Sequence, residues 1–218
     1  MQPEFWKAKW QAGQIGFHSD AVHIDLIEYS KTWLADGPHR ILVPLCGKSV
    51  DLAWMTAQGH EVIGIELVKS AVVALFEAAG LAPTWHRVAG GECARAGRLT
   101  VYCGNLFELS PQTIGPVTRI WDRAAFIALH PDQRAAYSAF VQACAAPNAS
   151  LLMNVLHYDP AIMDGPPWSV DADVVAKHYP QAALHGRRDA LDDRWKARGH
   201  QRVDAVAWQS QLNRATGH

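Results

Sequence analysis

The feature that most restricts the fold of this chain is a repeated alternation of short apolar runs with segments of helical periodicity. Two of the apolar runs are followed by a segment whose apolar residues recur at helical spacing and which ends at a glycine. The strand-like runs are 40–44 and 61–66, and the helical segments that follow them are 49–58 and 70–79. This order predicts an α/β fold, an open, twisted, mostly parallel sheet with helices on both faces.

The rest of the chain continues the alternation. The run 99–103 is expected to be the return arm of a hairpin that turns at Ala96-Gly97, and the apolar run 151–156 predicts a strand buried on both faces. Further strands are predicted at 118–121 and, as an edge strand, at 203–212. Helices are predicted at 132–145, where Pro147-Asn148 are expected to end the helix, and at 170–179. Because no linker-like stretch divides the sequence, residues 1–218 are expected to form a single domain.

Composition excludes several classes of protein. The 218 residues are 49% hydrophobic and 19% charged, which excludes intrinsic disorder, and a formal charge of −1 argues against nucleic-acid or anionic-membrane partners. No apolar run approaches 18 residues, and the N-terminal segment is charged. We therefore expect neither a membrane span nor a signal peptide, and we expect the protein to be cytoplasmic. The four cysteines form no C-x-x-C pair, and no metal site is expected.

The carboxyl ends of the strands are the expected place for a ligand, because open α/β sheets bind ligands there. The first such loop does not suit phosphates. A phosphate-binding loop needs a glycine where Leu42 stands, Pro44 removes an amide donor, and Gly47 is the single glycine available to a dinucleotide fingerprint. Glu66 follows Gly47 by 19 residues, the offset at which an acid accepts both ribose hydroxyls; alternatively, Glu66 caps the next helix. A nucleoside without phosphates, such as S-adenosylmethionine, meets this description.

Several motifs together resemble the thiopurine S-methyltransferase family, over residues 4 to about 200. The segments that carry the resemblance are Val43-Pro-Leu-Cys-Gly-Lys-Ser49 with Asp51-Leu-Ala-Trp54, Trp6 to Trp10, Ile15-Gly-Phe-His18, Gly59-His60 to Glu66, Asp122-Arg-Ala-Ala125, and Tyr158-Asp159 with Gly165-Pro-Pro167. The resemblance implies a class I, Rossmann-like methyltransferase fold with seven strands. It also implies two parts of the chain. Residues 36–218 form the Rossmann-like core, and residues 1–35 form an N-terminal helical lid that folds over the bound cofactor.

The resemblance also implies site residues. The family's contacts to S-adenosylmethionine fall on Trp10, Leu45, Glu66, Arg123, Asn105 and Leu106, and Gly47 lies in the same loop. Its contacts to the aromatic substrate fall on Phe17 and Arg194. Two residues depart from the bacterial pattern. Asn105 stands where members often carry Asp, and Trp168 stands where they commonly carry Phe and is expected to reshape the acceptor pocket.

Two of these residues have alternative roles on the sequence alone. Arg123 follows a predicted strand and is expected to stabilise the acceptor as its thiolate, which makes it the candidate catalytic residue; the alternative is a structural ion pair with Asp122. Trp10 either lies against the cationic end of the cofactor or anchors the first helix, sharing a face with Trp6.

The sequence therefore predicts a methyltransferase that uses S-adenosylmethionine and transfers the methyl group to the sulfur of small aromatic or heteroaromatic thiols by in-line displacement. Two alternatives remain open, a methyltransferase of inorganic selenium or tellurium species in detoxification, and a catalytically weak S-adenosylmethionine-binding protein. A small-molecule thiol is the expected partner, and the chain is expected to be a monomer.

Overall fold

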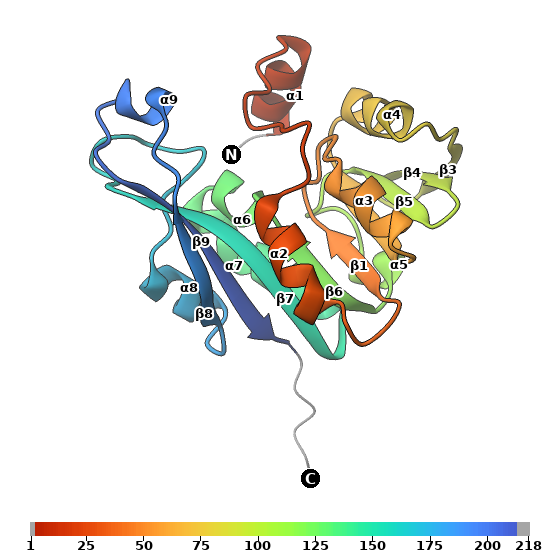
Figure 1. Ribbon diagram of the computed structural model, residues 1–218. Helices are drawn as coiled ribbons and strands as arrows, with labels where there is room; N and C mark the ends of the chain where they lie inside the picture. The colour runs from red at the N-terminus through yellow and green to blue at the C-terminus, as the bar shows by residue number, and fades with distance from the viewer. Residues whose placement is uncertain (1–2, 213–218) are drawn as a thin grey trace. The chain divides into compact units, whose positions relative to one another are not determined.

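The computed structural model describes residues 3–212. The chain forms two compact units, Met1–Arg119 and Ile120–His218, which run from red to green and from green to blue in Figure 1. Within the described residues, no helix is both long and apolar enough to cross a lipid bilayer.

The first unit contains helices and strands in alternation. Its elements are α1 (Pro3–Gln11), α2 (Ile24–Trp33), β1 (Arg40–Val43), α3 (Asp51–Ala57), β2 (Glu61–Glu66), α4 (Lys69–Ala78), β3 (Thr84–Val88), β4 (Gly91–Ala96), β5 (Leu99–Gly104), α5 (Pro111–Ile114) and the start of β6 (Val117–Asp122), which continues into the second unit.

The strands of the first unit lie in the order β3-β4-β5-β2-β1. The pairs β1–β2 and β2–β5 are parallel, as predicted, whereas β3, β4 and β5 form an antiparallel meander (Figure 1). The turn between β4 and β5 lies at Gly97, which confirms the predicted hairpin. Every residue of β2 after Glu61 is buried, which explains the continuous apolar run in this part of the sequence.

The second unit is built around three strands that pair with one another. Its elements are α6 (Ala125–Ala128), a short 3₁₀ helix (Pro131–Gln133), α7 (Arg134–Cys144), β7 (Ala145–Tyr158), α8 (Ala172–His178), β8 (Ala183–Asp189), α9 (Asp193–Lys196) and β9 (Val203–Gln211). The order of the paired strands is β7-β9-β8, and both pairs are antiparallel.

The α/β class is confirmed, but three details of the prediction are wrong. The described residues contain nine strands rather than seven, because β3 and β8 were not predicted. The strand β9 is not an edge strand, because it pairs with β7 on one side and β8 on the other. Pro147-Asn148 do not stop the helix, which ends at Cys144. They lie in the first residues of β7, before its pairing with β9 begins at Ser150.

Candidate functional site

The loop after β1 and the end of β2 are joined by Glu66. Its Oε2 accepts a hydrogen bond from the Gly47 amide at 2.8 Å, and its Oε1 accepts one from the Val68 amide, also at 2.8 Å. Val68 is the N-cap residue of α4, so Glu66 binds the amide that precedes this helix, which supports the alternative considered from the sequence. The bond to Gly47 also occupies the amide that a phosphate would need, and it places a carboxylate where a phosphate would be repelled.

Local backbone geometry explains why a glycine stands in this loop. Leu45 and Gly47 both have positive φ, 48° and 55°, a conformation that glycine adopts at no steric cost and a leucine seldom adopts. A Cβ atom at Gly47 would lie 3.4 Å from the Trp10 ring, so the absence of a side chain lets the indole approach the loop.

Burial sets the electrostatics of Glu66. The side chain is almost wholly buried, and this desolvation raises the pKa of its carboxyl above the usual value, although the amides of Val68, Gly47 and Leu67 act in the opposite direction. Each carboxylate oxygen accepts one hydrogen bond from a backbone amide, at Gly47 or Val68, and has the capacity to accept a second. Glu66 can therefore still receive two hydroxyl donors.

Three aromatic rings of the N-terminal segment cluster together, and one of them, Trp10, approaches Gly47. Trp6 and Trp10 both make edge contacts with the Phe17 ring, at centroid distances of 5.6 and 5.9 Å. No residue of α1 is buried, so Trp10 is not a core anchor. Phe17 is 43% exposed and lies beside Trp10, which brings the predicted substrate contact and one predicted cofactor contact together.

Asn105 and Leu106 follow β5, which pairs with β2 so that Cys103 lies opposite Glu66. The Asn105 side chain stabilises its own turn, since Oδ1 accepts from the Phe107 amide at 3.2 Å and Nδ2 donates to Glu108 at 2.9 Å. One amide hydrogen and one acceptor site remain available. Leu106 is buried. The register thus places both residues at the same strand edge as Glu66.

In the second unit, the loop after β6 is organised by Asp122. This fully buried carboxylate accepts from the amides of Ala125 and Phe126 through Oδ1, at 2.8 and 3.2 Å. Its Oδ2 accepts from the Tyr137 hydroxyl at 2.7 Å. Burial raises the pKa of Asp122 to about 6, and these three bonds oppose that rise.

These three bonds hold the Asp122 carboxylate against the start of α6 and against α7. Arg123 lies between the Asp122 anchor and α6, and it is partly exposed. Tyr137 was not predicted as a site residue. In the sequence it belongs to the apolar stripe of a helix, which normally marks only core packing.

The other two predicted substrate residues lie on separate segments of this unit. The Trp168 amide donates to the Ile127 carbonyl at 2.7 Å, and its ring makes an edge contact with His130 at 4.9 Å. Arg194 lies in α9 and is 74% exposed, with its Nη2 2.7 Å from the Asp192 carboxylate.

We expect Tyr137→Phe to destabilise the protein by about 1.5–3 kcal/mol, the usual value of a hydrogen bond to a charged group. The buried carboxylate would lose its hydroxyl donor, and its pKa would rise above its present value of about 6 because that bond lowers it. Urea unfolding at pH 7.5 measures the loss. Tyr29→Phe, on the partly exposed face of α2, is the matched control, and equal effects of the two variants would contradict the prediction.

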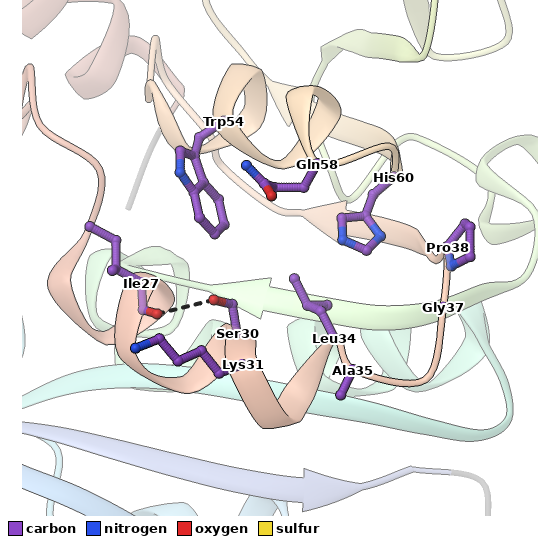
Figure 2. Close-up of a pocket in the computed structure, with 10 residues that line it drawn as sticks. All are labelled: Ile27, Ser30, Lys31, Leu34, Ala35, Gly37, Pro38, Trp54, Gln58 and His60. Carbon is purple, nitrogen blue, oxygen red and sulfur yellow. Dashed lines mark hydrogen bonds between the residues drawn. The ribbon is translucent and has the colours of Figure 1, made fainter.

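A pocket of about 580 Å³ lies in the first unit, and none of the predicted site residues lines it (Figure 2). It is lined by Ile27, Ser30, Lys31, Leu34, Ala35, Gly37, Pro38, Trp54, Gln58 and His60. It is therefore formed by α2, the end of α3 and the segment before β1, whereas Gly47 and Glu66 lie after β1 and at the end of β2.

One wall of this pocket belongs to a buried pair of histidines. The rings of His39 and His60 stack at 5.6 Å, and His60 Nδ1 accepts from the His39 amide at 3.0 Å. His39 Nε2 lies 2.8 Å from Asp36, which Arg119 also binds. Burial lowers the pKa of both imidazoles, and the positive charge of Arg119 adds to this effect.

Acid should therefore destabilise the protein through this pair. Because the pKa of His60 is lower in the folded than in the unfolded chain, stability is complete above pH 6.5 and falls as the pH drops through that value. Protonation also removes the Nδ1 acceptor, a loss of about 0.5–1.5 kcal/mol. Urea unfolding from pH 7.5 to 5.5 should show a smaller decline for His60→Asn than for wild type. His86→Asn, on the exposed face of β3, should decline like wild type, and the same decline in all three proteins would refute this account.

Comparison with known proteins identifies the family. The family described as thiopurine S-methyltransferase matches residues 1–213. A thiopurine S-methyltransferase of Bordetella petrii is 36% identical over 97% of this chain and 99% of its own length, and one of Xanthomonas campestris is 41% identical over 79% of each chain. The chain belongs to the thiopurine S-methyltransferase family. As a member, it is a methyltransferase that uses S-adenosylmethionine.

Solved structures agree with this family in fold. A 1,6-didemethyltoxoflavin N1-methyltransferase of Burkholderia thailandensis matches with a TM-score of 0.63, covering 96% of this chain and 86% of that one at 16% identity. A methyltransferase of Anabaena variabilis matches with a TM-score of 0.66, covering 96% and 94% at 12% identity. The class I methyltransferase fold is thereby confirmed for this thiopurine S-methyltransferase family member.

The residues in the structure fit the cofactor of this family. The buried Glu66 keeps acceptor capacity for a diol, its carboxylate disfavours a phosphate, and the Gly47 backbone is open except for the indole of Trp10. These features suit a nucleoside that carries a cationic, phosphate-free substituent.

Proposed function

We propose that this protein transfers a methyl group from S-adenosylmethionine to the sulfur of small aromatic or heteroaromatic thiols. The observation that carries the cofactor half is the hydrogen bond between the Gly47 amide and the Glu66 carboxylate, with Trp10 packed on the glycine. The substrate half is supported by the name of relatives that are 36–41% identical over most of their length.

We assign the cofactor-binding role to Trp10, Leu45, Gly47, Glu66, Asn105, Leu106 and Arg123. In this assignment Glu66 accepts the ribose hydroxyls, Leu45 and Gly47 offer the backbone of their loop to the amino-acid part, and Asn105 and Leu106 flank the adenine. The register that places Cys103 opposite Glu66 supports a common edge for these groups. Residues 1–35 act as a lid, with Trp10 and Phe17 as its contacts to the ligands.

The bound cofactor would supply a methyl group activated by its sulfonium charge. The chain's own contribution is to orient the acceptor sulfur and to keep it ionised. Phe17, Trp168 and Arg194 are assigned to the acceptor, and Arg123 stabilises the thiolate by its positive charge. The transfer forms one S–C bond as another breaks, and the thiol proton leaves to solvent before transfer. No strong base is required for an acidic thiol.

The remaining proposals concern the context of the reaction. We propose that the chain acts as a cytoplasmic monomer and as a single methyltransferase domain over residues 1–218. Size-exclusion chromatography with light scattering tests the monomer, and cell fractionation tests the compartment. No observation in the described residues favours inorganic selenium or tellurium species as acceptors, or a protein that binds the cofactor without turnover.

A methyl-transfer assay over a panel of thiols tests the function. We expect transfer to 6-mercaptopurine and to thiophenol-type acceptors, with formation of S-adenosylhomocysteine. Transfer to selenite-derived species but to no organic thiol would contradict the substrate class. Saturable binding of S-adenosylhomocysteine without any transfer would show a binding protein, and folded protein that does not bind it would reject the whole proposal.

A further inference from the structure

Arg134 is a buried cation, and two of its guanidinium nitrogens have no hydrogen-bond partner among the described residues. It is the first residue of α7, only 3% exposed, and its guanidinium lies over the Phe126 ring at 5.0 Å. Among the described residues, neither Nε nor Nη2 has a hydrogen-bond partner. Buried charged groups are normally paired, because an unpaired one carries its full desolvation penalty. This pair of donors therefore points to an acceptor that the protein itself does not supply.

The two unpartnered atoms are informative in themselves. The Nε and Nη2 hydrogens point in the same direction, and together they form the side-on fork that binds the two oxygens of a carboxylate. The electrostatic surroundings do not replace such a partner. Burial lowers the pKa of the Arg134 guanidinium, the nearby Asp171 opposes this effect, and a bound anion would reverse it.

A second buried donor belongs to a segment that contacts the same helix, α6, as Arg134. The indole Nε1 of Trp168 is buried and has no partner among residues 3–212. Its amide is bonded to the carbonyl of Ile127, the neighbour in α6 of the Phe126 that underlies Arg134. A Cβ atom at Gly165 would lie 2.4 Å from the Trp168 ring, so this glycine lets the chain pack directly on the indole and fix it. Arg134 and the backbone of Trp168 thus contact neighbouring residues of α6.

Aromatic side chains surround this corner of the second unit. The Phe126 ring contacts His178 at 5.4 Å and Tyr179 at 6.0 Å, and the Trp168 ring contacts His130 at 4.9 Å. Aromatic surface combined with a fork of N–H donors suits a planar, aromatic anion better than a small hydrated ion.

We propose that Arg134, assisted by the Trp168 indole N–H, binds a carboxylate carried by the aromatic methyl acceptor. The inference rests on the proposed S-methyltransferase function, and it adds to that function a preference for acidic acceptors. It gives Arg134 and Trp168 a specificity role that is separate from the role of Arg123 at the reacting sulfur.

Two acceptors that differ only by the carboxylate test this preference. Wild-type protein should methylate 2-mercaptobenzoate with a higher kcat/KM than thiophenol. Arg134→Met should lower kcat/KM for 2-mercaptobenzoate about 10- to 100-fold more than for thiophenol, mainly through KM. Trp168→Phe should change the ratio in the same direction by less. Arg87→Met, an exposed arginine of β3, is the control and should leave the ratio as it is. An unchanged ratio in Arg134→Met would overturn the proposal, because a purely structural role lowers both values alike.

Binding of benzoate to the full chain separates this inference from the proposed function, since it needs no turnover. Calorimetry should show saturable binding to wild type and to Arg87→Met, and at least a tenfold weaker affinity for Arg134→Met. If that variant does not fold, Arg134→Lys keeps a cation but loses the fork, and the same weakening is expected. Such binding without methyl transfer to any thiol would reject the function and keep the carboxylate site. Absent or unaltered benzoate binding would reject the site, and buried water would then satisfy both donors.

Discussion

Glu66→Ala should weaken binding of S-adenosylhomocysteine by about 10- to 150-fold, the equivalent of losing a hydrogen bond to a charged group. The carboxylate is the buried acceptor that we assign to the ribose hydroxyls, and no other acid lies at the end of β2. The variant also leaves the amides of Gly47 and Val68 without their acceptor, so the loop after β1 should lose part of its order. Calorimetric titration measures the change in affinity, and thermal unfolding measures the change in stability.

Two variants make this test specific. Glu77→Ala removes a carboxylate from the exposed face of α4 and should bind as tightly as wild type. Glu66→Gln keeps one acceptor oxygen but turns an amide donor toward a backbone N–H, so an intermediate affinity is expected. Because burial raises the pKa of Glu66, wild-type affinity should also begin to fall at a higher pH than an exposed glutamate would give. A lower melting temperature with unchanged affinity in Glu66→Ala would restrict Glu66 to capping α4.

The sequence was informative about the fold where packing is strongest. The strands β1 and β2 are buried on both faces, so their apolar runs stand out, and their predicted bounds agree with the structure within one residue. The strands β3 and β8 expose most of their side chains, and segments such as Gly186-Arg-Arg-Asp189 have no apolar alternation to detect. The strand β9 was predicted to lie at an edge because β8, the strand that pairs with its second side, was not predicted.

At the site, too, residues with a local sequence signal were predicted, and residues positioned by tertiary packing were not. The offset of 19 residues between Gly47 and Glu66 anticipated two groups that the structure joins by a hydrogen bond. Tyr137 and Arg134 carried no comparable signal. Their importance follows from where α7 packs, against Asp122 and Phe126, and such a contact is fixed by tertiary structure rather than by local pattern. A tyrosine in an apolar stripe and a single arginine at a helix start are common in ordinary helices.

Arg123→Ala should lower kcat/KM for thiols about 10- to 100-fold at neutral pH, on the basis that a nearby cation lowers a thiol pKa by one to two units. The Asp122 carboxylate fixes the turn that carries Arg123, through the amides of Ala125 and Phe126. The turn should therefore persist when the guanidinium is removed, because Asp122 holds it. Affinity for S-adenosylhomocysteine should change much less than kcat/KM, and Arg87→Ala is the control for a loss of positive charge elsewhere.

The pH dependence decides whether Arg123 acts on the thiolate. If it does, the acid limb of the kcat/KM profile of Arg123→Ala moves upward by one to two pH units, and wild-type and variant rates converge at high pH, where the thiol is ionised without help. With an acceptor that is already ionised at pH 7, the difference in kcat/KM between wild type and Arg123→Ala should likewise be smaller. Arg123→Lys retains a charge and should recover part of the shift, although it lacks the planar fork. A uniform fall at every pH, accompanied by weaker cofactor binding, would instead restrict Arg123 to its cofactor contact and exclude a role at the thiolate. Only an effect on acceptor ionisation depends on the thiol pKa.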